Sequence, residues 1–440
     1  MLKTLRLHTD NTQLMDKSLR LLLEGEWTHF GNVATKVGNI PGTFLTLITS
    51  APMFVYFSAW SAGFFVLVFH CGSYVFLRKS LLLIYENRAS QISLGLIFLS
   101  LIFWLNPWRV EQVELYNPGF LFLFAGLHLW TALKMYEKNF WMTFFHVLGI
   151  GFCFQVHFSF LVIGLVSLFL FLRRQMIVSW KGFACGTVVV LASLIPFLLT
   201  KFFADETLQS QQIQNLDFSK SDAFFGRNFV LVYPVLKAIL YFFRMGSTYF
   251  GRHIFSEIQF QWIENEILRD VVYYGFHSLK YVVTLASLGL SFYLIGKFMR
   301  SQFQQKIWKQ TVTNLEPKNR FNNYFFYLFV AAVVAAGLSP VEFNHWHLVI
   351  CFPVISVFVI TQLLNYERVL RHQKKIILGV AGVFIVWDLF MAGGSRSHEF
   401  GLNYQAQFTE HYKNKYETLD DRLGHSILWE KIKVLLLNNE

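Results

Sequence analysis

Long apolar runs separated by short polar connections are the dominant pattern of the chain. A helix of roughly 17–25 apolar residues crosses the hydrocarbon core of a bilayer, which is about 30 Å thick. A weaker run over 42–57 follows Pro41 and contains Pro52, so we expect it to dip into the membrane without crossing it. The predicted spans are 59–83, 91–107, 118–134, 140–156, 157–173, 183–203, 271–297, 323–338, 347–365 and 374–391.

Basic residues gather in every second connection between these runs. The formal net charge of +11 is that of some nucleic-acid-binding proteins, but the distribution of the basic residues favours a membrane topology instead. In the other short connections, Arg109 is the only basic residue. By the positive-inside rule, the connections rich in basic residues are therefore cytoplasmic. The cytoplasmic set comprises Arg78, Lys79, Arg88, Lys134, Lys138, Arg173, Arg174, Lys181, the cluster from Lys297 to Arg320, Arg368, Arg371, Lys374 and Lys375.

This orientation divides the chain into five parts. Two long polar regions, 204–270 and 392–440, are too short for independent soluble domains, and we expect them to cap an extracytoplasmic cavity. The tail is predicted to end in a short amphipathic helix, Ile427–Leu437. The parts are 1–58, the first extracytoplasmic loop with an interfacial helix and a membrane re-entry; 59–203, transmembrane helices; 204–270, a long extracytoplasmic loop; 271–391, transmembrane helices; and 392–440, an extracytoplasmic C-terminal tail.

Composition supports the same class. Hydrophobic residues make up 54% of the 440 positions, with 50 phenylalanines, which is too apolar for a soluble protein of this size. We therefore predict an all-α polytopic membrane protein, a bundle of about 10–11 transmembrane helices. The eleventh is a helix expected ahead of the given N-terminus, because a polar segment on the outer side needs a span to carry it across. All four cysteines lie in apolar runs and are interpreted as core thiols.

The stretch 7–43 is the first candidate functional segment. Asp10 is placed to cap a helix, and Leu14, Leu19 and Leu22 follow at helical spacing, which predicts an amphipathic helix along the membrane surface. Glycines and Pro41 then end the helix and turn the chain toward the bilayer. The alternative interpretation is an ordinary interfacial helix with a solvated aspartate at its cap.

Further polar groups fall on the predicted outer side, close to the ends of the spans. Ionisable groups at membrane depth are costly, so they usually face a cavity or a partner. An ordinary role remains open for each: His157 can simply bond a neighbouring helix, and Glu111 and Glu114 can be solvated loop charges. The His345 and His347 pair is only a weak metal signal. The candidates are Arg109, Glu111, Glu114, Asn117, Gln155, His157, His277, Lys280, Glu342, Asn344, His345, His347 and Asp388.

Several of these stretches together resemble a known enzyme family. An acidic residue, an interfacial helix, a Gly-x-Trp and a Gly/Pro-bearing re-entry resemble the first extracytoplasmic loop of the GT-C membrane glycosyltransferases. The nearest branch is that of the protein O-mannosyltransferases and the lipid A aminoarabinose transferase. One departure is Asn11, which stands where the family usually has a second acid. The matching residues are Asp10, the helix to Glu24, Gly25-Glu26-Trp27, Gly38–Thr43, Asn117-Pro118 and Gln155–His157.

The resemblance implies transfer of a sugar from a polyprenyl-phosphate donor to a lipid, glycan or protein acceptor, with inversion, on the extracytoplasmic side. It makes Asp10 the general base and an arginine or lysine the group that holds the departing phosphate. No cofactor is expected, and a divalent metal is possible but unsupported by spacing. Membrane lipids are expected as partners besides the donor and the acceptor, and no nucleic acid is expected. The substrate-binding candidates are His8, Arg109, Glu111, Glu114, Asn117, Gln155, His157, Arg227, Arg252, Lys280, His345 and His347.

Other functions are compatible with the same pattern. A polysaccharide polymerase would use arginines of the 204–270 loop and would not need Asp10. A flippase of lipid-linked glycans would line a transport path with the same charges, although no internal repeat is visible. A membrane O-acyltransferase would use a buried histidine. The bacterial cytoplasmic (inner) membrane is the expected location, because the chain has no eukaryotic retention signal.

Overall fold

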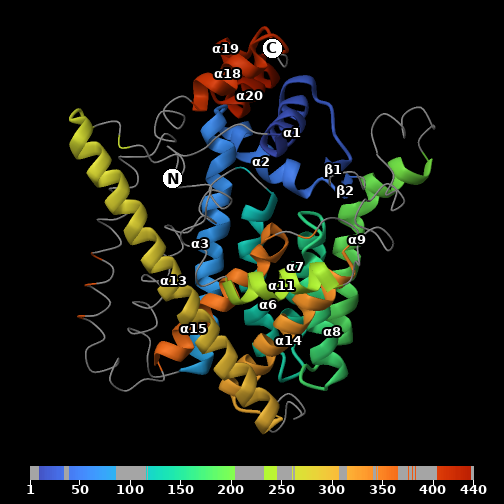
Figure 1. Ribbon diagram of the computed structural model, residues 1–440. Coiled ribbons are helices and arrows are strands. Elements are labelled where there is room, and N and C mark those ends of the chain that lie inside the picture. The colour runs from blue at the N-terminus through green and yellow to red at the C-terminus, as the bar shows by residue number, and fades with distance from the viewer. Residues whose placement is uncertain are drawn as a thin grey trace.

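In the part of the chain that the computed structural model describes, the regular structure is helical apart from one two-stranded antiparallel ribbon. It consists of a helical bundle and a smaller cap that covers one end of the bundle (Figure 1). The residues that the structure describes are 9–33, 39–85, 115, 117–203, 232–244, 260, 263–306, 315–339, 343, 345–364, 375, 379, 382 and 404–437.

The bundle runs back and forth between the cap and the opposite end. At the cap end, the start of α6 and the turn after α7 are joined by a hydrogen bond from Asn117 to Val156. At the opposite end, Tyr85 donates to the Thr361 carbonyl and Ile177 donates to the Met135 carbonyl. The elements of the bundle are α3 (Ala59–Ile84), η3 (Asn117–Phe120), α6 (Leu121–Lys134), α7 (Phe140–Phe154), α8 (Phe160–Leu172), α9 (Trp180–Phe203), α11 (Val232–Arg244), α13 (Glu266–Gln305), α14 (Pro317–Gly337), η8 (His345–Cys351) and α15 (Phe352–Leu364).

The cap joins the two ends of the described chain. Tyr412 donates to the Thr12 carbonyl, and Lys415 pairs with Asp16, so the C-terminal tail lies on the first helix. The two described segments therefore lie at the same end of the bundle, and the side of the membrane that this end faces stays a prediction. The cap consists of α1 (Thr9–Leu19), η2 (Arg20–Glu24), β1 (Phe30–Val33), β2 (Asn39–Pro41), α2 (Phe44–Val55), α18 (Tyr404–Lys413), α19 (Leu419–Arg422) and α20 (Ile427–Leu437).

Local sequence explains where several helices begin. The Asn139 side chain accepts from the Met142 amide at the start of α7, and Asn265 does the same for Leu268 at the start of α13. Such side chains satisfy backbone donors that have no partner in the first turn. In α2, Pro52 lies near the end of a 12-residue helix that is too short to span a bilayer, as expected for a re-entry.

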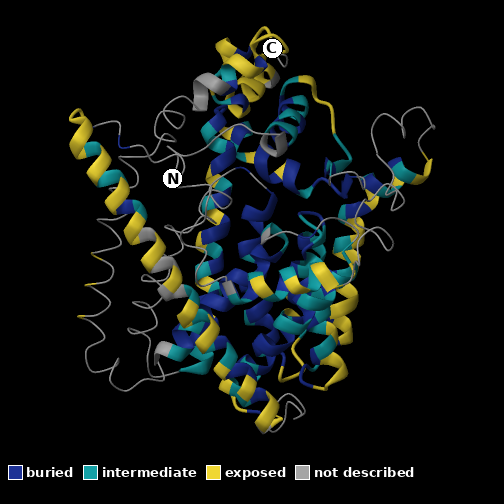
Figure 2. Cartoon of the chain, viewed as in Figure 1, coloured by how far each residue is buried: buried dark blue, intermediate teal, exposed yellow. Residues whose placement is uncertain are grey.

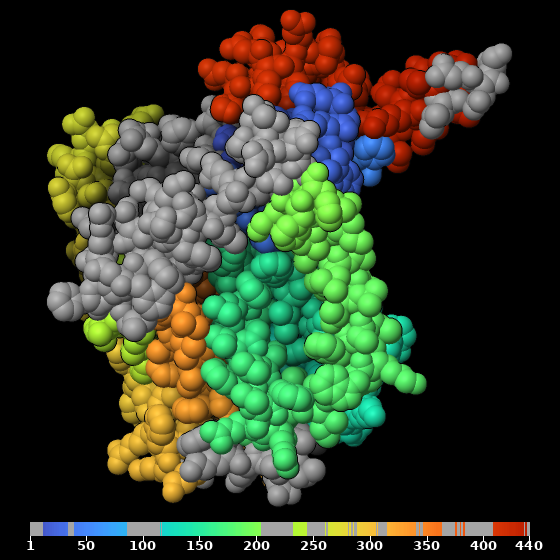
Figure 3. Space-filling view, turned by 90° about the vertical axis from the view of Figure 1, so that its right-hand side faces the viewer, coloured from blue at the N-terminus to red at the C-terminus, as the bar shows by residue number. Residues whose placement is uncertain are grey.

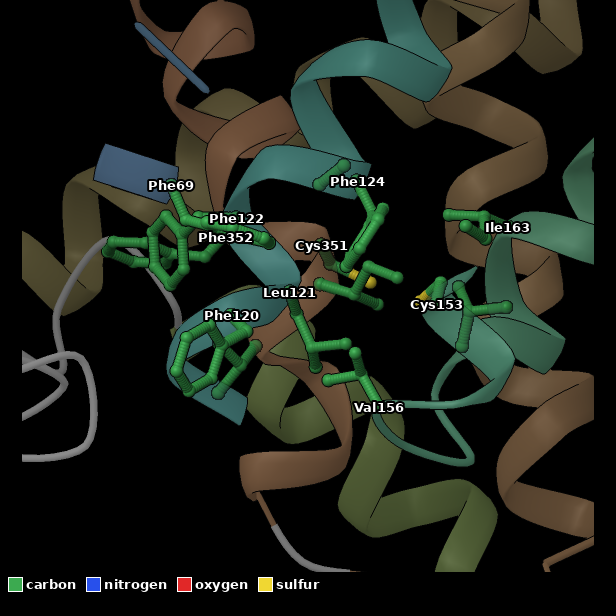
Figure 4. Packing of buried hydrophobic residues seen from close by; sticks show 14 of the residues in the cluster. Phe69, Phe120, Leu121, Phe122, Phe124, Cys153, Val156, Ile163, Cys351 and Phe352 are labelled. Atoms are coloured by element: carbon green, nitrogen blue, oxygen red, sulfur yellow. The ribbon is translucent and has the colours of Figure 1, made fainter. Parts of the chain in front are cut away.

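Aromatic packing fills the middle of the bundle, where most side chains are buried (Figure 2). Phe69 of α3 packs edge-on against Phe120, and Phe122 meets Phe352 of α15 in a similar geometry (Figure 4). Edge-to-face pairs of this kind stabilise a core beyond the area that they bury. The aromatic residues at the start of α6 therefore hold α3 and α15 together.

One buried polar cluster crosses this apolar core. His128 of α6 lies 2.6 Å from the Tyr324 hydroxyl of α14 and 2.7 Å from the Ser167 hydroxyl of α8. His146 of α7 lies 2.9 Å from the same Ser167 hydroxyl and 2.8 Å from that of Thr131. In the sequence, His128 and His146 stand in separate apolar runs, but the packing of α6 against α7 brings their rings together. The cluster links four helices by hydrogen bonds, and these bonds satisfy polar groups that are buried away from water.

The predicted spans are met in part. Only α3 and α9, among the described helices, are long and apolar enough to cross a membrane by length and composition. Helices α7 and α8, with 15 and 13 residues, lie within the predicted spans 140–156 and 157–173, and their bounds differ from the predicted ones by at most three residues. Span 91–107 and nearly all of 374–391 lie outside the described residues.

The interpretation of the cysteines as core thiols holds for two of the four. Cys153 and Cys351 are buried, and their side chains lie in the aromatic core (Figure 4). Cys71 and Cys185 are exposed, so that interpretation is wrong for them. Cys71 shares an outward face of α3 with Phe64, because seven residues are two helical turns.

Close contact between α7 and α9 leads to a first prediction. A Cβ at Gly182 would lie 2.4 Å from the Phe140 carbonyl oxygen, a backbone atom that cannot move aside alone. Gly182→Ala is expected to destabilise the fold by about 1–3 kcal/mol, because the helices must separate. The matched control is Gly164→Ala in α8, where nothing lies within 4 Å of the added atom. Thermal unfolding of both purified variants tests this, and equal stability would contradict it.

Candidate functional site

The first helix carries the predicted catalytic aspartate. Helix α1 begins at Thr9, which places Asp10 in its first turn instead of ahead of it as a cap. The helix continues as a π-helical turn to Glu24, the predicted end, and Gly25 stops it with a φ of 72°. Position 10 lies one turn before Leu14 and two turns before Lys17 on the same stripe of the helix, and both of these residues are buried.

The short ribbon that follows was not predicted. Strand β1 pairs with β2 in antiparallel register, with Phe30 opposite Pro41 and Val33 opposite Asn39. The sequence does contain a signal for it, since Gly31-Asn32-Val33 is echoed by Gly38-Asn39-Ile40. Two similar Gly-Asn-apolar triplets separated by a few residues are compatible with a hairpin.

A chain of buried hydrogen bonds connects α1 to the bundle through this ribbon. The Lys17 amine donates to the Gly31 carbonyl and to the Asn32 Oδ1, the latter at 3.3 Å. The Asn32 amide donates to the Asn117 Oδ1 at 3.1 Å, and the Asn117 amide donates to the Val156 carbonyl at 3.1 Å. Every side-chain link donates in the same direction, from Lys17 toward the turn after α7. This Lys17–Val156 chain docks the loop onto the bundle.

Burial lowers the pKa of the Lys17 amine, the first donor in this chain of hydrogen bonds. Desolvation lowers the pKa of Lys17 from 10.5 to about 7; the neighbouring Asp16 opposes the change and Arg20 adds to it. The amine is therefore close to half protonated near neutral pH. Lys17 was not among the sequence candidates, because a lysine on an amphipathic helix is usually solvated.

A second contact joins the membrane re-entry to the same turn. Gly42 has a φ of 82°, and a Cβ there would lie 2.3 Å from the Oε1 atom of Gln155. Gln155 is buried, and its amide donates to the Ser193 hydroxyl of α9 at 2.6 Å. Only glycine satisfies both the backbone conformation and the space at position 42. The Gly-Pro stretch and the Gln-x-His stretch, which are far apart in sequence, thus meet at the cap end.

Two predicted histidines also come together there. The rings of His157 and His347 lie 5.6 Å apart between centroids. Ser159 connects them: its hydroxyl oxygen lies 2.8 Å from the His347 carbonyl oxygen and 2.6 Å from His157 Nδ1. His347 also stacks on Phe343 and lies beside Trp346. The site therefore has an aromatic wall on one side of a histidine pair.

The backbone contact of His157 favours one tautomer of the neutral ring. The Ser159 backbone amide donates to Nδ1 at 3.2 Å, and a ring that accepts at Nδ1 carries its proton on Nε2. Within the described part of the chain, Nε2 has no hydrogen-bond partner. His157 can thus donate one hydrogen bond to an oxygen of a bound molecule.

The remaining predicted site residues divide into three groups. The structure describes the backbone of Asp10 in α1, Lys280 in α13 and His345 in η8, without their side chains. Asn117 and Gln155 use their amide groups to hold the loop and α9, and their binding of substrate stays a prediction. Those outside the described residues are His8, Arg109, Glu111, Glu114, Arg227 and Arg252.

The described ranges contain no group of three or more histidine, cysteine, aspartate or glutamate side chains placed to hold a metal ion. The side chain of His345 is not described, so metal binding by His345 and His347 stays a weak sequence signal.

The pKa of Lys17 leads to a second prediction. Between pH 7 and 10.5 the unfolded chain binds more protons at this amine than the folded protein, so stability rises with pH over that window. Lys17→Met is expected to remove this rise, and below pH 7 the difference between the two proteins becomes constant. Thermal unfolding at pH 7 and pH 9.5 measures the effect. Lys413→Met, at an exposed position of α18, is the control, and identical pH profiles for all three proteins would contradict the prediction.

No protein-family model, curated protein or solved structure matches this chain. Its functional assignment therefore depends on the sequence resemblance and on the geometry of the cap end.

Proposed function

We propose that this protein is an integral membrane glycosyltransferase that moves a sugar from a polyprenyl-phosphate donor to an acceptor on the extracytoplasmic side. The supporting observation is that separate family-like stretches meet at one end of the bundle. The loop carrying Asp10 packs over Asn117 and over the turn that contains Gln155 and His157. An active site built from these stretches requires this convergence.

The outward faces of the long helices support a membrane location. On α9, Val188, Leu191, Ile195, Leu199 and Phe202 are all exposed. Their spacing of three or four residues places them on one stripe that is about 21 Å long at 1.5 Å per residue. A continuous apolar stripe of this length is unfavourable in water and favourable against lipid.

The basic residues of the described connections support the orientation. Lys134 and Lys138 flank the connection from α6 to α7, at the end of the bundle away from the cap. Arg173 and Arg174 follow α8 at the same end, and Arg320 there donates to the Leu133 carbonyl at 3.4 Å. By the positive-inside rule this end is cytoplasmic, so the cap and the candidate site face outward.

In the proposed reaction, Asp10 takes the proton of the acceptor hydroxyl as that oxygen attacks the anomeric carbon. The bond from that carbon to the donor phosphate breaks, and the phosphate leaves with the electron pair. A carboxylate within hydrogen-bond reach of the hydroxyl is a suitable base. His157 donates a hydrogen bond from Nε2 to an oxygen of the sugar donor and so orients the donor.

The cation that stabilises the leaving phosphate comes from the remaining candidates. Arg109, Arg227 and Arg252 offer the planar guanidinium that matches a phosphate, and Lys280 offers a compact ammonium. Position 280 lies in the fourth turn of α13, and that helix begins at the cap end.

A third prediction tests the catalytic assignment. Asp10→Asn is expected to lower sugar transfer by roughly 10²–10⁴-fold at unchanged protein abundance, because the general base is lost. Transfer is measured in membranes supplied with a labelled polyprenyl-phosphate sugar pool. Asp16→Asn is the matched control, because this residue of the same helix pairs with Lys415 and Arg20. Undiminished transfer by Asp10→Asn would show that the residue is not the base.

The same assay separates the proposal from the polymerase alternative. A polymerase that uses the long loop would lose activity on substitution of Arg227 and Arg252 by alanine and retain it on substitution of Asp10. The glycosyltransferase proposal expects Asp10 to be the more damaging position.

A fourth prediction tests the topology by labelling single cysteines in a variant without the native ones. Lys413→Cys in α18 is expected to react with an impermeant maleimide in intact cells. Lys138→Cys, in the turn before α7, is expected to react only after permeabilisation. Both positions are exposed, so access to the reagent depends on the side of the membrane. The reverse pattern would contradict the orientation, and equal labelling would contradict the membrane placement.

A further inference from the structure

Helix α20 has more exposed apolar surface than its packing explains. Trp429 is 60% exposed and Leu436 is 62% exposed, and most of the helix projects from the body of the molecule (Figure 3). An isolated helix of 11 residues is marginal in water, and one with exposed tryptophan and leucine side chains is costlier still. A surface other than water is therefore needed to cover it.

Four of the six exposed apolar side chains described in α20 gather on one face. Positions 428, 429, 432 and 436 fall within a sector of about 100° at 100° per residue. Lys433 borders this face, Glu430 lies on the opposite side of the helix, and the exposed Val434 (54%) and Leu437 lie outside the sector. Ile427 is buried and Lys431 lies over the Phe54 ring, so a third face contacts α2. The helix is thus amphipathic in addition to being attached at one edge.

The attachment sets the height of α20 along the bundle. The Phe57 amide donates to the His425 carbonyl at 2.6 Å, and the Gly424 amide donates to the Phe57 carbonyl at 2.8 Å. Ser58, the next residue, caps the start of α3. The exposed apolar face of α3 begins one to two turns later, at Phe64. Helix α20 is therefore held where the apolar belt of the bundle begins.

The exposed apolar surface of α2 is continuous with that of α20. Leu47, Val55 and Tyr56 of α2 and its end are exposed beside α20. Together with the exposed face of α3, they form an apolar region that extends from α20 down the bundle.

We propose that α20 is an interfacial anchor that lies in the headgroup region of the outer leaflet, with Trp429, Ile432 and Leu436 toward the acyl chains. This proposal rests on the membrane placement proposed above. Tryptophan prefers this region, and lysines such as Lys433 extend from it toward phosphate groups. The anchor holds the C-terminal tail, and through Lys415 and Asp16 the first helix, at a fixed height above the bilayer.

The height and the composition both favour lipid over a protein partner. A protein-binding helix has no reason to lie level with the start of an apolar belt on another helix, whereas an interfacial helix does. A tryptophan and lysines around an apolar face are typical of helices that lie on membranes.

A fifth prediction tests the proposal with spin labels on the full chain, in lipid nanodiscs and in a variant without native cysteines. Ile432→Cys and Leu436→Cys labels are expected to be relaxed more by oxygen than by a water-soluble nickel chelate. Glu430→Cys and Val434→Cys labels are expected to show the opposite ratio. Val434 is the matched control, because it is apolar and exposed but lies on the other face. A Val188→Cys label reports the depth of a span.

The outcomes separate this inference from the membrane proposal. Oxygen-dominated relaxation at 188 with nickel-dominated relaxation at 432 and 436 would overturn the anchor and leave the membrane placement intact. Labels at 432 and 436 that are reached by neither reagent would indicate a protein partner and would also overturn it. Nickel-dominated relaxation at 188 as well would contradict the membrane placement itself.

Discussion

The docking of the N-terminal loop depends on one buried row of hydrogen bonds. Lys17, Asn32 and Asn117 each donate to the next group, and the row ends on the Val156 carbonyl. All three side chains are buried, so none can turn to water if its partner is lost, and each unpaired group would cost about 1–3 kcal/mol. Bonds that point in one direction also polarise one another. The row therefore specifies a single position for the loop over the bundle.

The rest of the cap end follows from that position. With the ribbon held on Asn117, Gly42 comes against Gln155, and α2 begins its short path along α3. The C-terminal tail then covers the outer side of α1 through Asp16 and is fixed to the start of α3 through Phe57. The proposed role of Asp10 as a general base needs this kind of rigidity, because misplacement of a base by about 1 Å can cost 10²-fold in rate.

The sequence predicted the elements whose signals are local and periodic. The first helical segment, α1 continued by η2, ends at Glu24 as expected because its leucines repeat at helical spacing up to Gly25, and the apolar runs correctly located most of the bundle. It missed contacts that depend on packing: a lysine among leucines gives no sign of its burial, and histidines 18 residues apart give no sign that α6 and α7 bring them together. The sequence drew attention to Gln155–His157, but the contact of Gln155 with Gly42 became visible only in the fold. The exposed Cys71 shows the same limit, since an apolar run does not reveal which of its faces is turned outward.

The most direct test of the central role of this row is a double-mutant cycle on Asn32 and Asn117. Asn32→Ala, Asn117→Ala and the double variant would be compared with the wild type by thermal unfolding in the same detergent. Because each side chain is a partner of the other, the two losses are expected to be non-additive, with a coupling of about 1 kcal/mol. Losses that add within about 0.3–0.5 kcal/mol would show that the two residues do not act together, and the docking of the loop would need another explanation.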